Sequence, residues 1–198
     1  MPNERGATLV EIMVGVWLLA LLLAVATAEL FHLRRTVDLR RLGRQIIADT
    51  LQCRIAALTT ARRVGLIFAV ESNKWFYCVV EDRDGDGVSR RDYQRGVDRP
   101  ISPRRWVEFL SGGTRLGVPE GWNVPDPSGR GTLPPDDGLR LGDAAIISFS
   151  PQAHATPSSV YFNDGRQRML AVRIAGRDGR VRLLEWHRGW PRWQEVHY

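Results

Sequence analysis

The sequence predicts an α+β fold in which one long N-terminal helix packs on an antiparallel β-sheet. Three observations predict this fold class: seventeen uncharged residues from Ile12 to Ala28, a helical apolar stripe after them, and strand-like patterning after Arg63. The chain has 198 residues, 43% of them hydrophobic, which suits one anchor and one globular domain. A domain of roughly 130 residues is large enough to bury its own core.

The helix is expected from about Ala7 to about Ala61, in two halves. Residues 7–33 form the transmembrane half, because seventeen uncharged residues are about the shortest stretch that spans a hydrocarbon core. Residues 34–62 form an amphipathic half, whose apolar stripe is expected to pack on the globular domain. The stripe consists of Leu39, Leu42, Ile46, Ile47, Leu51, Ile55 and Leu58.

Residues 63–198 are expected to form the β-rich globular domain. Strands at 64–70 and 74–80 are rich in branched and aromatic side chains and flank a turn at Ser72 and Asn73. Residues 117–138 are dense in proline and glycine and predict a long loop. Further strands are expected at 106–110, 114–118, 144–150, 158–162, 169–175 and 180–186.

The net charge of +6 is carried almost entirely by arginine, since Lys74 is the only lysine. Arginine favours flat, two-pronged contacts with carboxylates and phosphates. An acidic partner is one interpretation of this composition, and an arginine-rich solvated surface is the other.

The N-terminal segment does not fit a cleaved secretory signal, because its apolar run is too long and lacks a small-x-small cleavage site. As a plain anchor it meets another difficulty. Only Arg5 and the terminal amine precede the run, so the positive-inside rule would place the arginines that follow it in the cytoplasm. A dedicated export signal would override that orientation.

The stretch MPNERGATLVE resembles the prepilin leader of type IV pilins and type II secretion pseudopilins. That pattern is a short polar leader ending in glycine, followed by a hydrophobic helix with glutamate as its fifth mature residue. Here residues 1–6 would be the leader, prepilin peptidase would cleave between Gly6 and Ala7, and Glu11 is the fifth residue. The chain departs from the family in having Ala7 in place of phenylalanine and no proline midway along the helix.

The resemblance implies a single-pass protein of the bacterial inner membrane, with a periplasmic domain, that assembles into a pilus or pseudopilus. Glu11 is expected to meet the new N-terminal amine of a neighbouring subunit, because opposite charges attract strongly in a low-dielectric helix bundle. The alternative is a glutamate that snorkels at the headgroup edge. The implied partners are other pilin or pseudopilin subunits, prepilin peptidase and inner-membrane lipid.

The stretch ISFSPQAHATPSSVYFNDG and the later stretch LAVRIAGRDGRVRLLEW resemble the closing strands of the GspH/FimT-like group of minor pilins and pseudopilins. This implies a non-enzymatic structural subunit. The four histidines also give no catalytic pattern, because none has a nearby nucleophile or metal-ligand spacing. They are His32, His154, His187 and His197.

A C-terminal hairpin is expected around a two-residue turn, Asp178-Gly179. This register places Arg177 opposite Arg180 and Ala175 opposite Arg182. One face of the hairpin then carries Arg173, Arg177, Arg180 and Arg182, and the core face carries Val172, Ile174, Val181 and Leu183.

The stretch GRVR at 179–182 resembles the GRxR motif of FimT-like minor pilins that bind DNA during natural transformation. Binding of double-stranded DNA is therefore the alternative function. The other interpretation is that this arginine face is exposed to solvent and binds nothing. The tryptophans that follow would add stacking surfaces for bases or belong to a core or subunit interface. They are Trp186, Trp190 and Trp193.

The loop EDRDGDGVSRRDY resembles the first half of a calcium loop, because Asp82, Asp84 and Asp86 alternate before Gly87. The twelfth position is a tyrosine, and Asp92 lies one residue before it. Calcium is therefore one expectation and a solvated acidic turn is the other. A membrane-tethered calcium-binding domain that does not polymerise is a third functional hypothesis.

The chain has two cysteines, Cys53 on the buried side of the helix and Cys78 in a predicted strand. An oxidising compartment would permit a disulfide between them, worth roughly 3 kcal/mol. Two buried free thiols are the equal alternative.

Overall fold

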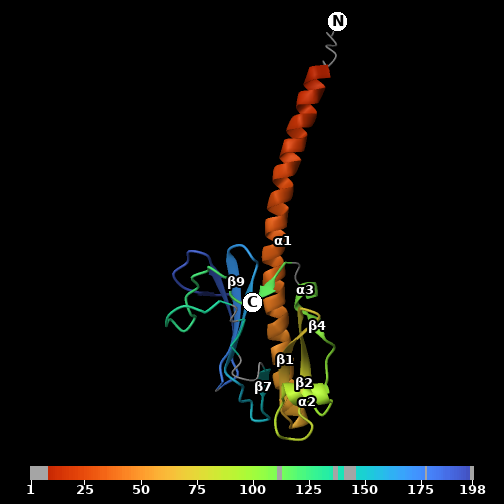
Figure 1. Ribbon diagram of the computed structural model, residues 1–198, viewed down its shortest axis with the longest axis vertical. Coiled ribbons are helices and arrows are strands. Elements are labelled where there is room, and N and C mark those ends of the chain that lie inside the picture. The colour runs from red at the N-terminus through yellow and green to blue at the C-terminus, as the bar shows by residue number, and fades with distance from the viewer. Residues whose placement is uncertain (1–8, 111–112, 136–137, 141–145, 177, 197–198) are drawn as a thin grey trace. The chain divides into compact units, whose positions relative to one another are not determined.

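The computed structural model describes residues 9–110, 113–135, 138–140, 146–176 and 178–196, with the side chains of 27–36, 109, 110 and 140 left out. The chain divides into two units, Met1–Arg34 and Arg35–Tyr198 (Figure 1). The long helix α1, Leu9–Thr60, begins in the first unit and continues into the second. The architecture is α+β, as the sequence predicts.

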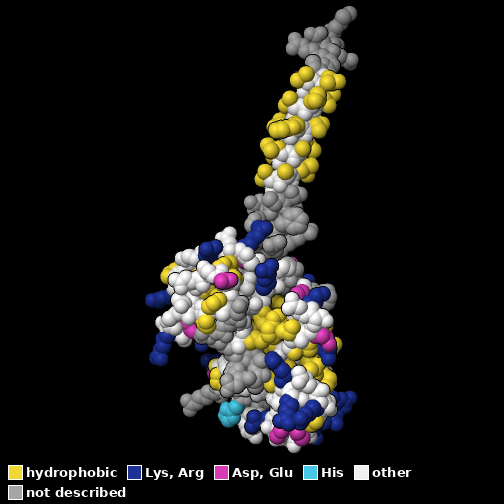
Figure 2. Space-filling view, viewed as in Figure 1, with side chains coloured by type: hydrophobic (Ala, Val, Ile, Leu, Met, Phe, Trp, Pro, Cys, Tyr) yellow, Lys and Arg dark blue, Asp and Glu magenta, His cyan; other side chains and the backbone are white. Residues whose placement is uncertain are grey.

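In the first unit, residues 12–26 of α1 are apolar on all sides. Its window Leu9–Ala26 has a mean hydropathy of 2.6 and no buried residue, and Figure 2 shows hydrophobic side chains along this segment. Within the described residues it is the one helical segment long and apolar enough to cross a membrane. Its only charged residue is Glu11, in the first turn of α1.

In the second unit, the first sheet is antiparallel and follows α1 directly. Its long strands β1 (Val64–Glu71) and β2 (Lys74–Glu81) form the predicted hairpin, with left-handed backbone at Ser72 and Asn73. The sheet has the order β3-β2-β1-β7, and β4 also pairs with β2. The shorter strands are β3 (Arg99–Pro100), β4 (Arg105–Trp106) and β7 (Ile146–Phe149).

The second sheet is also antiparallel and has the order β11-β10-β9-β8-β5, with β6 paired to β8. Its strands are β5 (Arg115–Leu116), β6 (Leu139–Arg140), β8 (Ser158–Asn163), β9 (Arg168–Ile174), β10 (Val181–His187) and β11 (Gln194–Glu195). The sequence predicted strands in the regions of β5, β8, β9 and β10 but not β6 or β11, and it predicted one sheet rather than two.

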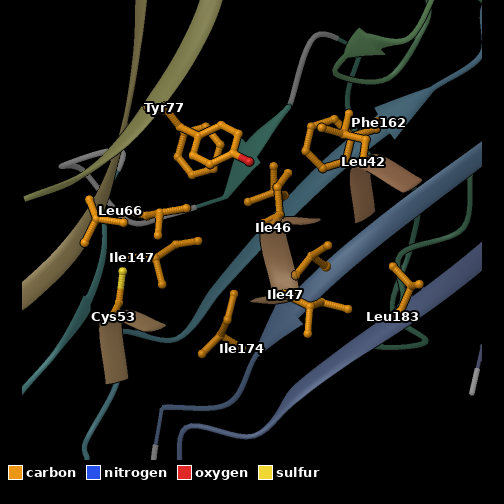
Figure 3. Close-up of a cluster of buried hydrophobic side chains, with 14 of the residues drawn as sticks. Leu42, Ile46, Ile47, Cys53, Leu66, Tyr77, Ile147, Phe162, Ile174 and Leu183 are labelled. Carbon is orange, nitrogen blue, oxygen red and sulfur yellow. The ribbon is translucent and has the colours of Figure 1, made fainter. Parts of the chain in front are cut away.

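The main core lies between the two sheets, and α1 supplies its centre. Figure 3 shows Ile46 and Ile47 of the helix between Leu66 and Ile147 of the first sheet and Leu183 of the second. Each such side chain contributes about 1.5–3 kcal/mol through burial. Gly43 allows close approach here, because a Cβ at this position would lie 2.9 Å from Cδ1 of Leu183. The helix passes through Gly43 unbroken.

Smaller clusters cover the outer faces of both sheets. The first sheet carries Phe76, Cys78 and Val80 against a segment that contains the short helix α2, Arg90–Arg95. On the second sheet, Val118, Val124 and Leu133 of the predicted long loop pack against Trp186. These three residues anchor the loop on this face of the sheet, although many of its other described residues are exposed.

Two sequence-based predictions are wrong. Residues 107–110 form the helix α3, Val107–Leu110, where a strand was expected. The apolar stripe of α1 is buried only in part: Leu39, Leu42, Ile46 and Ile47 are buried, but Leu51, Ile55 and Leu58 are 42%, 61% and 50% exposed. The helix turns a different face to the core near its end, where Cys53 and Ala57 are buried instead.

Candidate functional site

The residues that carry the prepilin resemblance lie at the start of the chain. Gly6 and Ala7 fall outside the described residues. Glu11 is described, and it lies exposed in the first turn of α1, near the start of the apolar window Leu9–Ala26. A carboxylate in the first turn stabilises a helix, because the N–H groups of that turn have no partners within the helix and favour negative charge.

The C-terminal hairpin has a different register from the predicted one. Arg173 pairs with Arg182, and Val181 pairs with Ile174. The connection from 176 to 179 has four residues, because Ala175 donates its N–H to the carbonyl of Arg180 at 2.9 Å. The predicted two-residue turn and the opposition of Ala175 to Arg182 are therefore wrong.

Despite that shift, three of the four predicted arginines share one face of the hairpin. Arg173, Arg180 and Arg182 line a pocket of about 330 Å³, together with Pro127 and Trp193. The apolar residues predicted for the opposite face pack in the main core. Arg177 lies outside the described residues.

The sequence analysis missed the acidic side chains beside this pocket. Asp178 Oδ2 lies 3.2 Å from Nε of Arg180, and Glu195 Oε1 lies 3.9 Å from Nε of Arg182. These exposed ion pairs offset part of the repulsion between opposed arginines, each by less than about 1 kcal/mol. Within the described part of the chain, Arg173 has no such carboxylate.

The tryptophans belong to the outer cluster of the second sheet. Trp186 is buried and donates its indole N–H to the carbonyl of Trp190 at 2.8 Å. Trp193 is half-buried and donates to the carbonyl of Pro125 at 2.6 Å, which fixes its ring against the long loop. Trp193 alone among the three lines the arginine pocket.

The aspartate loop brings three of its four predicted ligands together. One carboxylate oxygen from each of Asp82, Asp84 and Asp86 lies within 4.8 Å of the others. Asp84, through a hydrogen bond and its charge, raises the pKa of Asp86 above its ordinary value. Asp92 lies outside this group and contacts Ser89, which caps α2.

The same loop is held closed by hydrogen bonds to its own backbone. Asp82, which is buried, accepts the N–H groups of Gly85 at 2.7 Å and Gly87 at 3.0 Å. Asp98, which the sequence analysis missed, accepts the N–H of Ser89 at 3.0 Å. These bonds account for the shape of the turn, and calcium at this loop stays a sequence-based prediction.

The two cysteines are free thiols, so the disulfide alternative is not what the structure shows. Cys53 belongs to the main core, whereas Cys78 faces the outer cluster of the first sheet. Successive side chains of a strand point to opposite faces of the sheet. In β2, Tyr77 and Val79 point into the main core with Cys53, so Cys78 between them points to the other face. Burial raises the pKa of both thiols.

We expect neither thiol to react with an alkylating reagent at pH 8 in the folded chain, because the reactive thiolate is suppressed and both side chains are buried. In denaturant without reductant, two thiols per chain should react. Mass spectrometry of the alkylated protein measures this. Two unreactive cysteines in denaturant would instead show a disulfide.

A buried charged cluster that the sequence analysis missed joins α1 to the first sheet. Asp49, which is 2% exposed, accepts the hydroxyl of Tyr77 at 2.9 Å and lies 3.1 Å from Nε of Arg105. Burial and then the charge of Asp49 raise the pKa of Tyr77, which stays a hydrogen-bond donor. The signal was present in the sequence, since Asp49 lies on the helical seam of Leu42, Ile46 and Cys53.

A second ion pair joins the same helix to the second sheet. Glu185 of β10 is buried and lies 2.7 Å from a guanidinium nitrogen of Arg40. Arg168 and His187 each lie 3.5 Å from its other oxygen. The two clusters place charged contacts on both sides of α1, one for each sheet.

Comparisons with protein families, with curated proteins and with solved structures found no match for the chain. A long apolar N-terminal helix followed by antiparallel sheets is a pilin-like architecture.

Proposed function

We propose that the chain is a minor pilin or pseudopilin, a non-enzymatic subunit of a type II secretion pseudopilus or a type IV pilus. The observation that carries this proposal is Glu11 in the first turn of one unbroken, exposed apolar helix, five residues after the expected cleavage site. Prepilin peptidase would remove residues 1–6, and the helix would pass from the inner membrane into a filament. The sheet domain would present its surface to other subunits.

Leader processing tests this proposal. We expect the full chain, co-expressed with prepilin peptidase, to lose residues 1–6 and to begin at a methylated Ala7. Gly6→Leu should abolish cleavage, because the bulky side chain would occupy the place of the small residue before the scissile bond. Gly15→Leu is the control, since a Cβ there meets nothing within 4 Å. Intact mass measures both, and an uncleaved parent chain would contradict the proposal.

Filament assembly tests the role of Glu11. In cells with the assembly machinery, Glu11→Ala should leave the protein in the membrane but remove it from the sheared filament fraction. Glu120→Ala, at an exposed position of the domain, should assemble like the parent. If Glu11→Ala also assembles like the parent, Glu11 has no part in assembly, and the non-polymerising hypothesis gains support.

A second candidate function is DNA binding in DNA uptake, and the pocket formed by Arg173, Arg180 and Arg182 beside Trp193 favours it. Arginines on a rigid hairpin suit phosphates, and an indole edge suits a base or sugar. Asp178 and Glu195 weigh against it, because they already lie beside two of these arginines.

Salt-dependent binding of double-stranded DNA to the full chain in detergent tests this second function. Three phosphate contacts predict a log–log salt slope of about −3, made shallower by about 2 in the double variant Arg180→Ala/Arg182→Ala. The control Arg91→Ala/Arg95→Ala removes two exposed arginines from α2, so it matches the change in net charge. Equal loss in both double variants would contradict a site on the hairpin.

A further inference from the structure

The exposed side of α1 carries a second apolar seam within Arg35–Tyr198. Its residues are Ala48, Leu51, Ile55 and Leu58, all exposed, preceded on the same side by Arg44. Neither sheet covers this seam, although the opposite side of the helix is fully buried in the main core. In the described part of the chain, Arg44 has no hydrogen bond or ion pair.

The N-terminal part of the same helix is apolar on all sides, so it offers a line of residues with the same spacing after a residue of the opposite charge, Glu11. Steps of four, three, four and three residues separate Glu11, Gly15, Leu18, Leu22 and Val25. The same steps separate Arg44, Ala48, Leu51, Ile55 and Leu58. Alternating steps of three and four residues are the spacing at which two parallel helices pack along a seam.

We propose that this seam binds the N-terminal helix of a second copy of the chain, in parallel, with Glu11 of that copy beside Arg44. The proposal rests on the proposed function and names one subunit contact within the filament. Because 1.5 Å separates successive residues of a helix, the second copy is displaced along the axis by roughly 50 Å. Its N-terminal helix must therefore leave the lipid before the contact forms.

Charge and shape select this register over its neighbours. Gly15 meets Ala48, so the backbones approach closely at a pair of small residues, and each later pair is apolar on both sides. Pairing Glu11 with Arg41 instead would place Leu22 opposite Gln52. A shift by one full heptad would place Glu11 opposite Val37 or Leu51, where the seam offers no arginine.

This contact differs from the one that the prepilin resemblance implies, in which Glu11 meets a terminal amine. A carboxylate has two oxygens and accepts from more than one donor. The Arg44 guanidinium therefore adds a second cation to the same group, from a subunit at a larger axial displacement.

Cysteine cross-linking of the full chain in sheared filaments tests the proposal. In a chain that carries both Leu18→Cys and Leu51→Cys, oxidation should produce a ladder of dimers, trimers and larger species. Each copy would be cross-linked through its Leu18→Cys position to one neighbour and through its Leu51→Cys position to another. Either single variant should give no ladder. Leu18→Cys with Val70→Cys is the matched control, since Val70 is 51% exposed on β1 and away from the seam.

Charge reversal tests the register. Arg44→Glu in the double-cysteine chain should lower the cross-link yield about tenfold or more, because it sets two carboxylates side by side in the contact. Arg91→Glu makes the same charge change on the exposed surface of α2, away from the seam, and should leave the yield unchanged.

The same samples separate this proposal from the function on which it rests. Processed protein in filaments without the Leu18–Leu51 ladder, or with an equal ladder in the Val70 control, would overturn the contact and leave the proposed function intact. A chain that keeps residues 1–6 and never enters filaments would overturn the proposed function first.

Discussion

Asp49→Ala is expected to lower the free energy of unfolding by about 3 kcal/mol, which is a large part of the stability of a domain of this size. The substitution removes the shared acceptor of Tyr77 and Arg105. Breaking a buried ion pair costs about 3–5 kcal/mol because one charge stays buried without its partner. We expect the lower end, since the side chain of Arg105 is 32% exposed and keeps part of its hydration.

Two further variants divide this loss between its causes. Tyr77→Phe removes only the hydroxyl and should cost about 1 kcal/mol. Asp49→Asn keeps an oxygen acceptor but loses the charge, so its loss should lie between those of the other two variants. Urea unfolding of the full chain in detergent, followed by tryptophan fluorescence, measures all three.

Asp178→Ala is the matched control for Asp49→Ala, because Asp178 forms an exposed pair with Arg180. We expect it to change the free energy of unfolding by less than about 0.5 kcal/mol. If Asp49→Ala matches this control, the buried cluster has no part in holding α1 to the first sheet.

The sequence predicted the fold class and the long helix because both depend on local patterns. Seventeen uncharged residues and a change of hydrophobic period at Arg63 do not require knowledge of distant contacts. The hairpin of β1 and β2 was predicted for the same reason, since Ser72 and Asn73 adopt the left-handed backbone that a tight turn needs.

The sequence-based predictions were wrong where contacts between distant segments of the chain determine the structure. Asp178-Gly179 is a strong local turn signal, but β9 leaves the hairpin two residues earlier than that turn requires, so Ala175 and not Arg177 pairs with Arg180. Gly179 packs near Phe149 of β7. Likewise, periodicity shows that a helix has an apolar side but not which of two apolar sides a sheet covers. The placement of Asp49 beside Tyr77 and Arg105 depends on how α1 docks on the first sheet.

The last prediction separates the two apolar sides of α1 with one residue type. Ile46 is fully buried between the sheets, and Ile55 is 61% exposed on the seam proposed to bind a second copy. Ile46→Ala should lower the free energy of unfolding by about 3 kcal/mol, because it removes buried methylene groups and leaves a cavity. Ile55→Ala should change it by less than about 0.5 kcal/mol, since the side chain is exposed and alanine favours helix.

In the cross-linking measurement, we expect Ile55→Ala to have the larger effect and Ile46→Ala the smaller one, the reverse of their effects on unfolding. Ile55→Ala in the double-cysteine chain should lower the yield of the Leu18–Leu51 ladder, because Ile55 meets Leu22 of the neighbouring copy in the proposed register. A chain with Ile46→Ala that still folds should keep its ladder, since Ile46 faces the core of its own domain. Equal unfolding losses at the two positions would show that both sides of the helix are covered within one chain, which would remove the basis of the proposed contact.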